Sequence, residues 1–171
     1  MLIPGQNAPE LDLPLTIDAR FVLADQSPEA FTMLVFYRGK HCPICKKYLT
    51  EIGGKLDSIT KRGINVFAVS MDSEDRAMVS HNEWDTHDLP LAHSMSEDKA
   101  REWGLYISEK REGSEEPDRF SEPGLFLVRP DGTIFMAQMQ SAPFTRPDID
   151  QLMENLDFVM KSDYPARGTA T

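Results

Sequence analysis

Two continuous apolar runs, residues 31–37 and 64–69, have the length of β-strands and lack polar alternation. Such runs are typical of strands covered on both faces, as in the middle of an α/β sheet. Weaker signals predict two strands nearer the N-terminus, at residues 10–15 and 20–23, and a short strand at residues 89–92.

Apolar residues at steps of three or four predict a helix after the first of these runs. It begins near Pro43, whose missing N–H costs nothing at a first helical position. Its apolar stripe comprises Ile44, Tyr48, Leu49, Ile52, Leu56 and Ile59. Gly53 and Gly54 lie within this stretch, so the helix should be weakened or bent there.

Three more helices are predicted further along the chain. They cover residues 73–85, residues 97–103 after the N-cap Ser96, and the segment that Pro147 opens. The alternation of strands and helices points to an α/β fold with a parallel sheet and right-handed crossovers.

The segment between residues 108 and 123 differs from the rest in composition. It holds six acidic, three basic and one large apolar residue, Phe120, and is predicted to be an exposed loop. Beyond it, residues 125–129 and 133–137 flank Pro130-Asp131-Gly132, which predicts an antiparallel hairpin.

Composition narrows the classes of protein that fit this pattern. A length of 171 residues favours one domain, and 18 Lys and Arg against 28 Asp and Glu give a net charge of −10. This charge argues against nucleic acid or an anionic membrane as partner. No apolar run approaches the ~18–20 residues that span a bilayer. Residues 1–7 lack a basic region and an apolar region, so no signal peptide is expected and a cytoplasmic location is predicted.

The two cysteines, Cys42 and Cys45, carry most of the chemical information. A disulfide between residues three apart closes a small loop and adds little stability through chain entropy. Redox chemistry or metal binding therefore explains the pair better than a structural role. A strand-to-helix junction places Cys42 at a helix N-terminus, where free N–H groups and the helix dipole favour a thiolate.

Neighbouring charges should lower the thiol pKa further. Residues 38–47 contain Arg38, Lys40, Lys46 and Lys47 without an acid, and His41 can add partial charge. Cys45 lies one helical turn on, where a thiolate is less favoured. We therefore expect Cys42 to attack and Cys45 to resolve the mixed disulfide.

Metal and cofactor sites fit the sequence poorly. Zinc requires four ligands, and His81, His87 and His93 are not at zinc-finger spacing, although a site shared between chains stays open. An iron–sulfur cluster needs more cysteines. Covalent haem needs His directly after the second cysteine, where Lys46 stands. We expect no metal and no cofactor. Asp72, just past the second apolar run, is predicted near the carboxyl edge of the sheet or as an ordinary turn residue.

The residues around the cysteines resemble the thioredoxin-like superfamily, in its redoxin or AhpC/TSA (peroxiredoxin-like) branch. The segment from Met33 to Lys46, with Cys42-Pro43-Ile44-Cys45, is joined by residues 64–72 and by residues 123–128 with their hairpin. The similarity covers residues 2–137. It implies a thioredoxin-like α/β fold over residues 1–171, with a central mixed sheet flanked by helices and a peroxiredoxin-type insertion. Residues 1–30 would form an N-terminal extension and residues 162–171 a flexible tail.

The resemblance implies a role for Pro123. In thioredoxin-like proteins a cis-proline at this place faces the active disulfide. The Glu122–Pro123 bond would then be cis, and the backbone of Glu122 would be free to pair with substrate.

Departures from the family separate two chemistries. Peroxiredoxins carry Thr and Arg where this chain has Gly39 and Pro123. Arg38 or Arg119 would have to replace the missing Arg. Thioredoxins carry Trp before the first cysteine and Gly-Pro between the pair, where this chain has His41 and Pro43-Ile44. These flanking residues tune the redox potential.

Three functional hypotheses follow. The first is a thiol–disulfide oxidoreductase that a thioredoxin-, glutaredoxin- or glutathione-like thiol regenerates. The second is a thiol peroxidase in which Cys42 becomes a sulfenic acid and Cys45 condenses with it. The third is a redox-regulated binding module that docks a partner through residues 108–123. Dimers are common among similar proteins, although no segment here demands one.

Overall fold

A central five-stranded sheet organises the chain, which we describe over residues 2–171 from a computed structural model. The strand order is β5-β4-β3-β8-β9. β3 (Phe31–Phe36), β4 (Ile64–Val69) and β5 (Leu91–Ala92) are parallel, whereas β8 (Gly124–Val128) and β9 (Ile134–Met139) add an antiparallel hairpin. The sheet is therefore mixed, as the resemblance implied.

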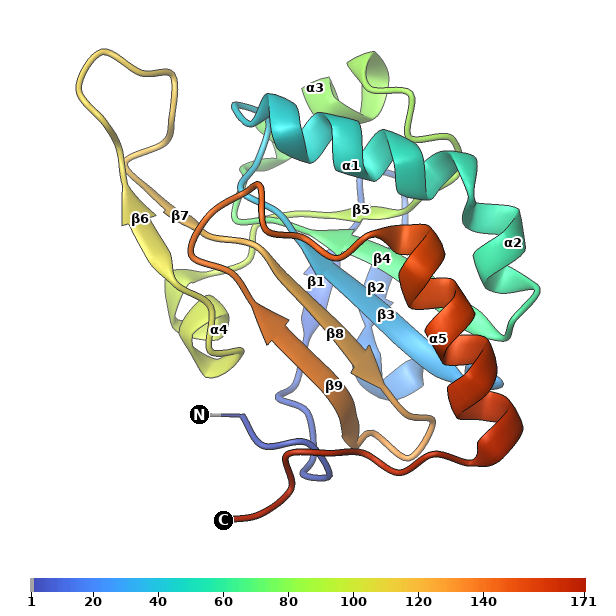
Figure 1. Cartoon of the computed structure of the whole chain (residues 1–171). Helices are drawn as coiled ribbons and strands as arrows, with labels where there is room; N and C mark the ends of the chain where they lie inside the picture. Colours follow the sequence, from blue (N-terminus) through green and yellow to red (C-terminus); the bar gives the residue numbers. More distant parts are fainter. Residues whose placement is uncertain (1) are drawn as a thin grey trace.

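Helices cover one face of this sheet, as Figure 1 shows. α1 (Pro43–Gly54), α2 (Leu56–Thr60) and α5 (Ile149–Ser162) lie in front of it, and α3 (Glu74–Glu83) links β4 to β5. The other face carries β1 (Asp12–Pro14), β2 (Arg20–Val22) and α4 (Glu97–Glu102). A short 3-10 turn, Leu23–Asp25, follows β2. Among the described residues, every helix is too short or too polar to cross a bilayer.

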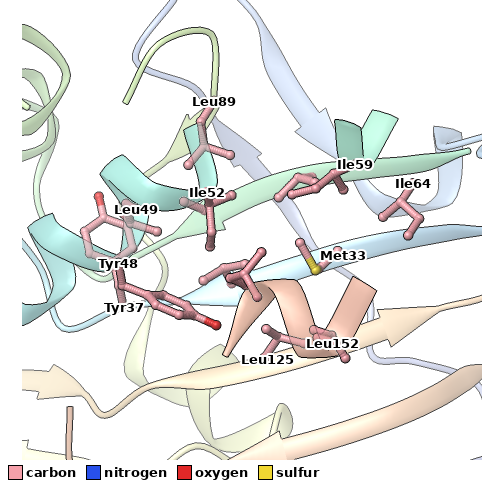
Figure 2. Close-up of a cluster of buried hydrophobic side chains, with 14 of the residues drawn as sticks. Met33, Tyr37, Tyr48, Leu49, Ile52, Ile59, Ile64, Leu89, Leu125 and Leu152 are labelled. Carbon is pink, nitrogen blue, oxygen red and sulfur yellow. The ribbon is translucent and has the colours of Figure 1, made fainter. Parts of the chain in front are cut away.

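The alternation of β3 side chains divides the core into two clusters. Met33 and Val35 point to the cluster with α1 and α5, which Figure 2 shows. Leu34 and Phe36 point to the cluster on the other face, where Trp103 packs against Phe36 with ring centroids 5.4 Å apart. A continuous apolar run thus corresponds to a strand buried on both faces, as its pattern predicted.

Most predicted elements appear near their expected positions, with some differences at the helix ends. The last helix starts at Ile149, because the side chain of Asp148 caps it by accepting the N–H of Gln151 at 2.9 Å. Ile44 was predicted within the buried stripe of the first helix, but its side chain is 42% exposed. It lies in the first turn of α1, where the helix has not yet reached the core.

The segment predicted as an exposed loop, residues 108–123, contributes a two-stranded ribbon instead. β6 (Ile107–Glu109) pairs antiparallel with β7 (Arg119–Ser121). Phe120 is buried at 1% exposure, and Glu116 at the turn of the ribbon is buried as well. Composition alone missed the ribbon because contacts with distant residues stabilise it.

The predicted bend at Gly53 and Gly54 is confirmed, since α1 ends at Gly54 and α2 begins at Leu56. Gly53 also allows a close approach: a Cβ atom there would collide with the backbone carbonyl of Thr86. At Gly54 the nearest atom to such a Cβ is Nε2 of His87, at 3.9 Å.

Alanine at Gly53 and alanine at Gly54 should therefore affect the free energy of unfolding differently. We expect Gly53→Ala to lower the free energy of unfolding by about 1–3 kcal/mol, because backbone must move. Gly54→Ala should leave it unchanged or raise it by up to ~1 kcal/mol, because alanine favours the helix. Urea unfolding of both variants measures the difference, and equal losses would contradict the assigned contact at Gly53.

Candidate functional site

Cys42 and Cys45 form a disulfide at the start of α1, with Cα atoms 5.2 Å apart. β3 ends at Phe36, the chain turns, and Cys42 takes the N-cap position in an extended conformation before Pro43. The backbone N–H of Cys45 donates to Sγ of Cys42 at 3.2 Å. The strand-to-helix junction thus places Cys42 at the helix N-terminus, as predicted.

Both sulfur-bearing side chains are buried in this disulfide form. Cys42 is 1% exposed and Cys45 0% exposed, whereas the neighbouring Ile44 is 42% exposed. Pro43 is exposed as well. The start of α1 therefore presents Pro43 and Ile44 to solvent, and a reacting partner must approach closely to reach Cys42.

Arg146 contacts the disulfide, although sequence reasoning did not include it in the site. Its Nη2 donates to Sγ of Cys45 at 3.1 Å, and its Nη1 donates to the carbonyl of Pro143 at 2.6 Å. The guanidinium lies over the ring of Tyr48, 5.1 Å from the centroid, and the hydroxyl of Tyr48 donates to the carbonyl of Pro147 at 2.9 Å. Burial lowers the pKa of Arg146 to about 10, which still leaves it cationic at neutral pH.

Acidic residues from distant segments compensate the charge of Arg38 in the basic cluster. Arg38 pairs with Glu116 and with Glu122, each at 3.4 Å, and its guanidinium lies 4.8 Å from the centroid of Phe120. Arg119, the other arginine considered, is held by Glu97 and Glu109 on the surface. The tertiary fold therefore compensates the charge of Arg38, one of the four cations of the predicted basic cluster, with carboxylates from distant segments.

Glu116 is the acid at the turn of the β6–β7 ribbon. The backbone N–H of Arg111 donates to its Oε2 at 2.9 Å, and the hydroxyl of Ser114 donates at 3.0 Å. These bonds, with the Arg111 side chain, lower the pKa of Glu116 to about 2. The ribbon is thus linked to Arg38 through a carboxylate that is ionised at neutral pH.

Asp72 holds the turn that precedes Cys42. Its buried carboxylate accepts the backbone N–H of Lys40 at 2.6 Å and Nε of Arg76 at 2.8 Å. Gly39 permits this approach, because its φ is +126° and a Cβ there would lie 2.6 Å from Oδ1 of Asp72. Asp72 therefore lies at the carboxyl edge of the sheet beside the cysteine turn. Lys40 contributes its backbone to this contact, while its side chain is exposed.

His41 does not add the partial charge expected of it. Burial, together with the charges of Arg38 and Arg76, lowers the pKa of His41 to about 4. Its Nδ1 faces Nη2 of Arg76 at 3.3 Å and so acts as the acceptor. Its ring packs edge-on against Phe120, with centroids 4.7 Å apart. His41 is therefore neutral at pH 7.

Pro123 lies at the same end of the sheet, but the expectation of a cis bond was wrong. No peptide bond in the described chain is cis, so Glu122–Pro123 is trans. β8 pairs Gly124 with Phe36, and the preceding Pro123 accepts the N–H of Gln140 at 2.9 Å. The N–H of Glu122 donates to the carbonyl of Tyr106 at 2.7 Å. The N–H of Glu122 is therefore not free for substrate, because it is bonded to the carbonyl of Tyr106.

A groove of about 260 Å³ opens beside Arg146, between the first turns of α1 and the segment before α5. Its lining consists of Ile44, Lys47, Tyr48, Glu51, Pro143, Phe144, Arg146, Pro147 and Asp148. Phe144 is 75% exposed at its edge. A larger cavity of about 590 Å³, lined by residues that include Thr32 and Val128, lies at the opposite end of β3 from the cysteines.

The neutral state of His41 predicts how stability depends on pH. The folded pKa of about 4 lies below the ordinary value of 6.5, so the unfolded chain binds the proton first. The free energy of unfolding should therefore fall as the pH drops from 6.5 to 4. We expect His41→Asn to remove roughly 1–3 kcal/mol of this pH-dependent loss.

Urea unfolding at several pH values checks this expectation. His87→Asn is the matched control, because His87 is exposed. The control should retain the pH dependence of the unsubstituted protein. A His41→Asn curve parallel to that of the unsubstituted protein between pH 4 and 6.5 would contradict the assignment.

Comparison with known proteins places these features in a family context. Residues 4–136 match the AhpC/TSA family. A comparison with curated proteins gives no significant match.

Solved structures share the fold at low sequence identity. The reduced 2-Cys peroxiredoxin of Plasmodium vivax has a TM-score of 0.75 at 13% identity, over 94% of this chain and 98% of that one. AhpC of Mycobacterium tuberculosis has a TM-score of 0.73 at 17% identity, over 96% of both chains. AhpC of Enterococcus faecalis has a TM-score of 0.75 at 16% identity, over 95% of this chain and 97% of that one.

Proposed function

The chain belongs to the AhpC/TSA family of thiol-based redox enzymes, and we propose that it exchanges disulfides through the Cys42–Cys45 pair. The observation that carries the proposal is the disulfide itself, formed between the N-cap and the first turn of α1. Disulfides that close so short a loop contribute little stability, so a catalytic role accounts better for the pair.

In the proposed oxidative half-reaction, the Cys42 thiolate attacks one sulfur of a substrate disulfide. The other substrate sulfur leaves as a thiolate with the bonding electron pair. The Cys45 thiolate then attacks Cys42 in the mixed disulfide, releases the second substrate thiolate and forms the Cys42–Cys45 bond. The N–H of Cys45 and the positive end of α1 stabilise the Cys42 thiolate.

An external thiol donor of the thioredoxin, glutaredoxin or glutathione type reverses these steps and regenerates the dithiol. Pro43 contributes by starting α1 directly after Cys42. Glu122 and Pro123, the substrate contacts expected from the resemblance, are both buried, and the N–H of Glu122 and the carbonyl of Pro123 are already bonded to Tyr106 and Gln140. The groove between Ile44 and Phe144 offers room for a substrate segment next to the pair.

A thiol peroxidase is the second candidate function, favoured by the fold shared with 2-Cys peroxiredoxins and AhpC. The Cys42 thiolate would attack a peroxide oxygen, hydroxide or alkoxide would leave, and Cys45 would displace water from the resulting sulfenic acid. Arg146 supplies a guanidinium beside the pair, although it contacts Cys45. Gly39 and Pro123 stand where peroxiredoxins carry Thr and Arg.

Rapid mixing of the reduced protein with hydrogen peroxide separates the two functions. Disulfide exchange as the main activity predicts slow oxidation, no faster than that of a free thiolate of low pKa. Tryptophan fluorescence and thiol counts follow the reaction. Loss of two thiols within a second at micromolar peroxide would instead establish a peroxidase.

Single-cysteine variants test the roles of the two sulfurs with a small aromatic disulfide as substrate. Cys42→Ser should lose turnover, because the attacking thiolate is gone. Cys45→Ser should trap a mixed disulfide on Cys42, detectable by its mass, because no sulfur resolves it. A mixed disulfide trapped on Cys45 in Cys42→Ser, with none formed in Cys45→Ser, would reverse the two roles. No redox turnover in the unsubstituted protein would favour the binding module.

A further inference from the structure

We propose that Arg146 is a catalytic residue that stabilises Cys45 as the leaving group, so that a reducing thiolate attacks Cys42. This inference rests on the proposed function, since it assigns the order of bond making and breaking within the same pair. It gives a role to a residue 101 positions away from Cys45 along the chain.

The side chain of Arg146 is fixed from several directions. Nη2 donates to Sγ of Cys45 at 3.1 Å, and Nη1 donates to the carbonyl of Pro143 at 2.6 Å. The guanidinium also packs over the ring of Tyr48, with its Cζ 5.1 Å from the ring centroid. The contact with sulfur is therefore in place before any reaction and requires no new ordering of the side chain.

Cys42 and Cys45 receive different kinds of stabilisation. Sγ of Cys42 accepts a neutral backbone N–H at 3.2 Å, whereas Sγ of Cys45 accepts an N–H from a full positive charge at 3.1 Å. Charge-assisted hydrogen bonds are roughly twice as strong as neutral ones. The helix N-terminus favours a thiolate at Cys42 in the dithiol, while Arg146 favours one at Cys45 once its bond to Cys42 breaks.

Reduction of the disulfide begins with attack on Cys42. The thiolate of the reductant attacks Sγ of Cys42 and forms a mixed disulfide with it. The covalent bond between Cys42 and Cys45 breaks. Sγ of Cys45 takes the electron pair and becomes a thiolate that accepts a hydrogen bond from Arg146. Attack on Cys45 would leave the guanidinium without an anionic partner, so the arrangement favours attack on Cys42.

Other charged groups face the guanidinium and must be counted with it. The charge of Arg38 opposes that of Arg146, and Glu122 and Tyr48 lie close enough to influence it. Arg38 is itself paired with Glu116 and Glu122. These carboxylates therefore form their ion pairs with Arg38, and the guanidinium of Arg146 directs an N–H to Sγ of Cys45.

The test compares Arg146→Met and Arg146→Lys in the protein with both cysteines. We expect Arg146→Met to slow reduction by dithiothreitol by roughly three- to twentyfold, because loss of the charge raises the pKa of the leaving thiol. Arg146→Lys should recover part of the rate. In a Cys42→Ser background, absorbance at the thiolate band should show that Arg146→Met raises the pKa of Cys45 by about one unit or more.

Arg129→Met is the matched control, because Arg129 also lies over an aromatic ring, 4.9 Å from the centroid of Phe135. Phe135 is on β9, and the control should reduce at the unsubstituted rate. An unchanged reduction rate and an unchanged pKa of Cys45 in Arg146→Met would overturn the proposal. A slower rate shared by Arg129→Met would also overturn it, since a general loss of stability would then be the cause.

If the protein does not exchange disulfides at all, the outcome differs from one in which only the role of Arg146 is wrong. If thiols and disulfides do not exchange with the unsubstituted protein, no rate comparison arises, and disulfide exchange is excluded. The pKa of Cys45 in the Cys42→Ser background still reports whether Arg146 stabilises its thiolate. Trapping with an alkylating agent and peptide mapping adds the site of attack: we expect the mixed disulfide on Cys42, and one on Cys45 would overturn the assignment.

Discussion

The buried carboxylate of Asp72 holds together the turn on which the site depends. It binds the backbone of Lys40 and the side chain of Arg76, and Gly39 gives it the room to do so. This anchor determines where the chain leaves β3 and therefore where α1 can begin. The N-cap position of Cys42 and its bond from Cys45 follow from that starting point.

Charge compensation gives the site its second constraint. Glu116 and Glu122 converge on Arg38, and Asp72 converges on Arg76, so these two arginines have carboxylate partners. His41 is neutral among them. Two directed groups act on the sulfurs, the N-terminus of α1 and the guanidinium of Arg146. Directed donors stabilise charge at a defined atom, whereas a surface cluster of lysines is screened by solvent.

Local pattern predicted the elements well where burial controls the sequence. The apolar runs became β3 and β4, and Gly53-Gly54 ended α1, because packing on both sheet faces and the limits of backbone geometry are visible residue by residue. The same local pattern did not predict the two-stranded ribbon within residues 108–123. Phe120 and Glu116 contact His41 and Arg38 there, and contacts between segments so distant leave no periodic signal.

The sequence alone determined the spacing of the two cysteines, the strand before them and the helix after them. Those features suffice to place a redox pair at a helix N-terminus, since each depends on neighbours within a few residues. Only the tertiary structure decided the charge around the pair, the trans bond before Pro123 and the contact of Arg146 with Cys45. Electrostatic effects depend on distances in space, and the groups that matter here come from segments far apart in the chain.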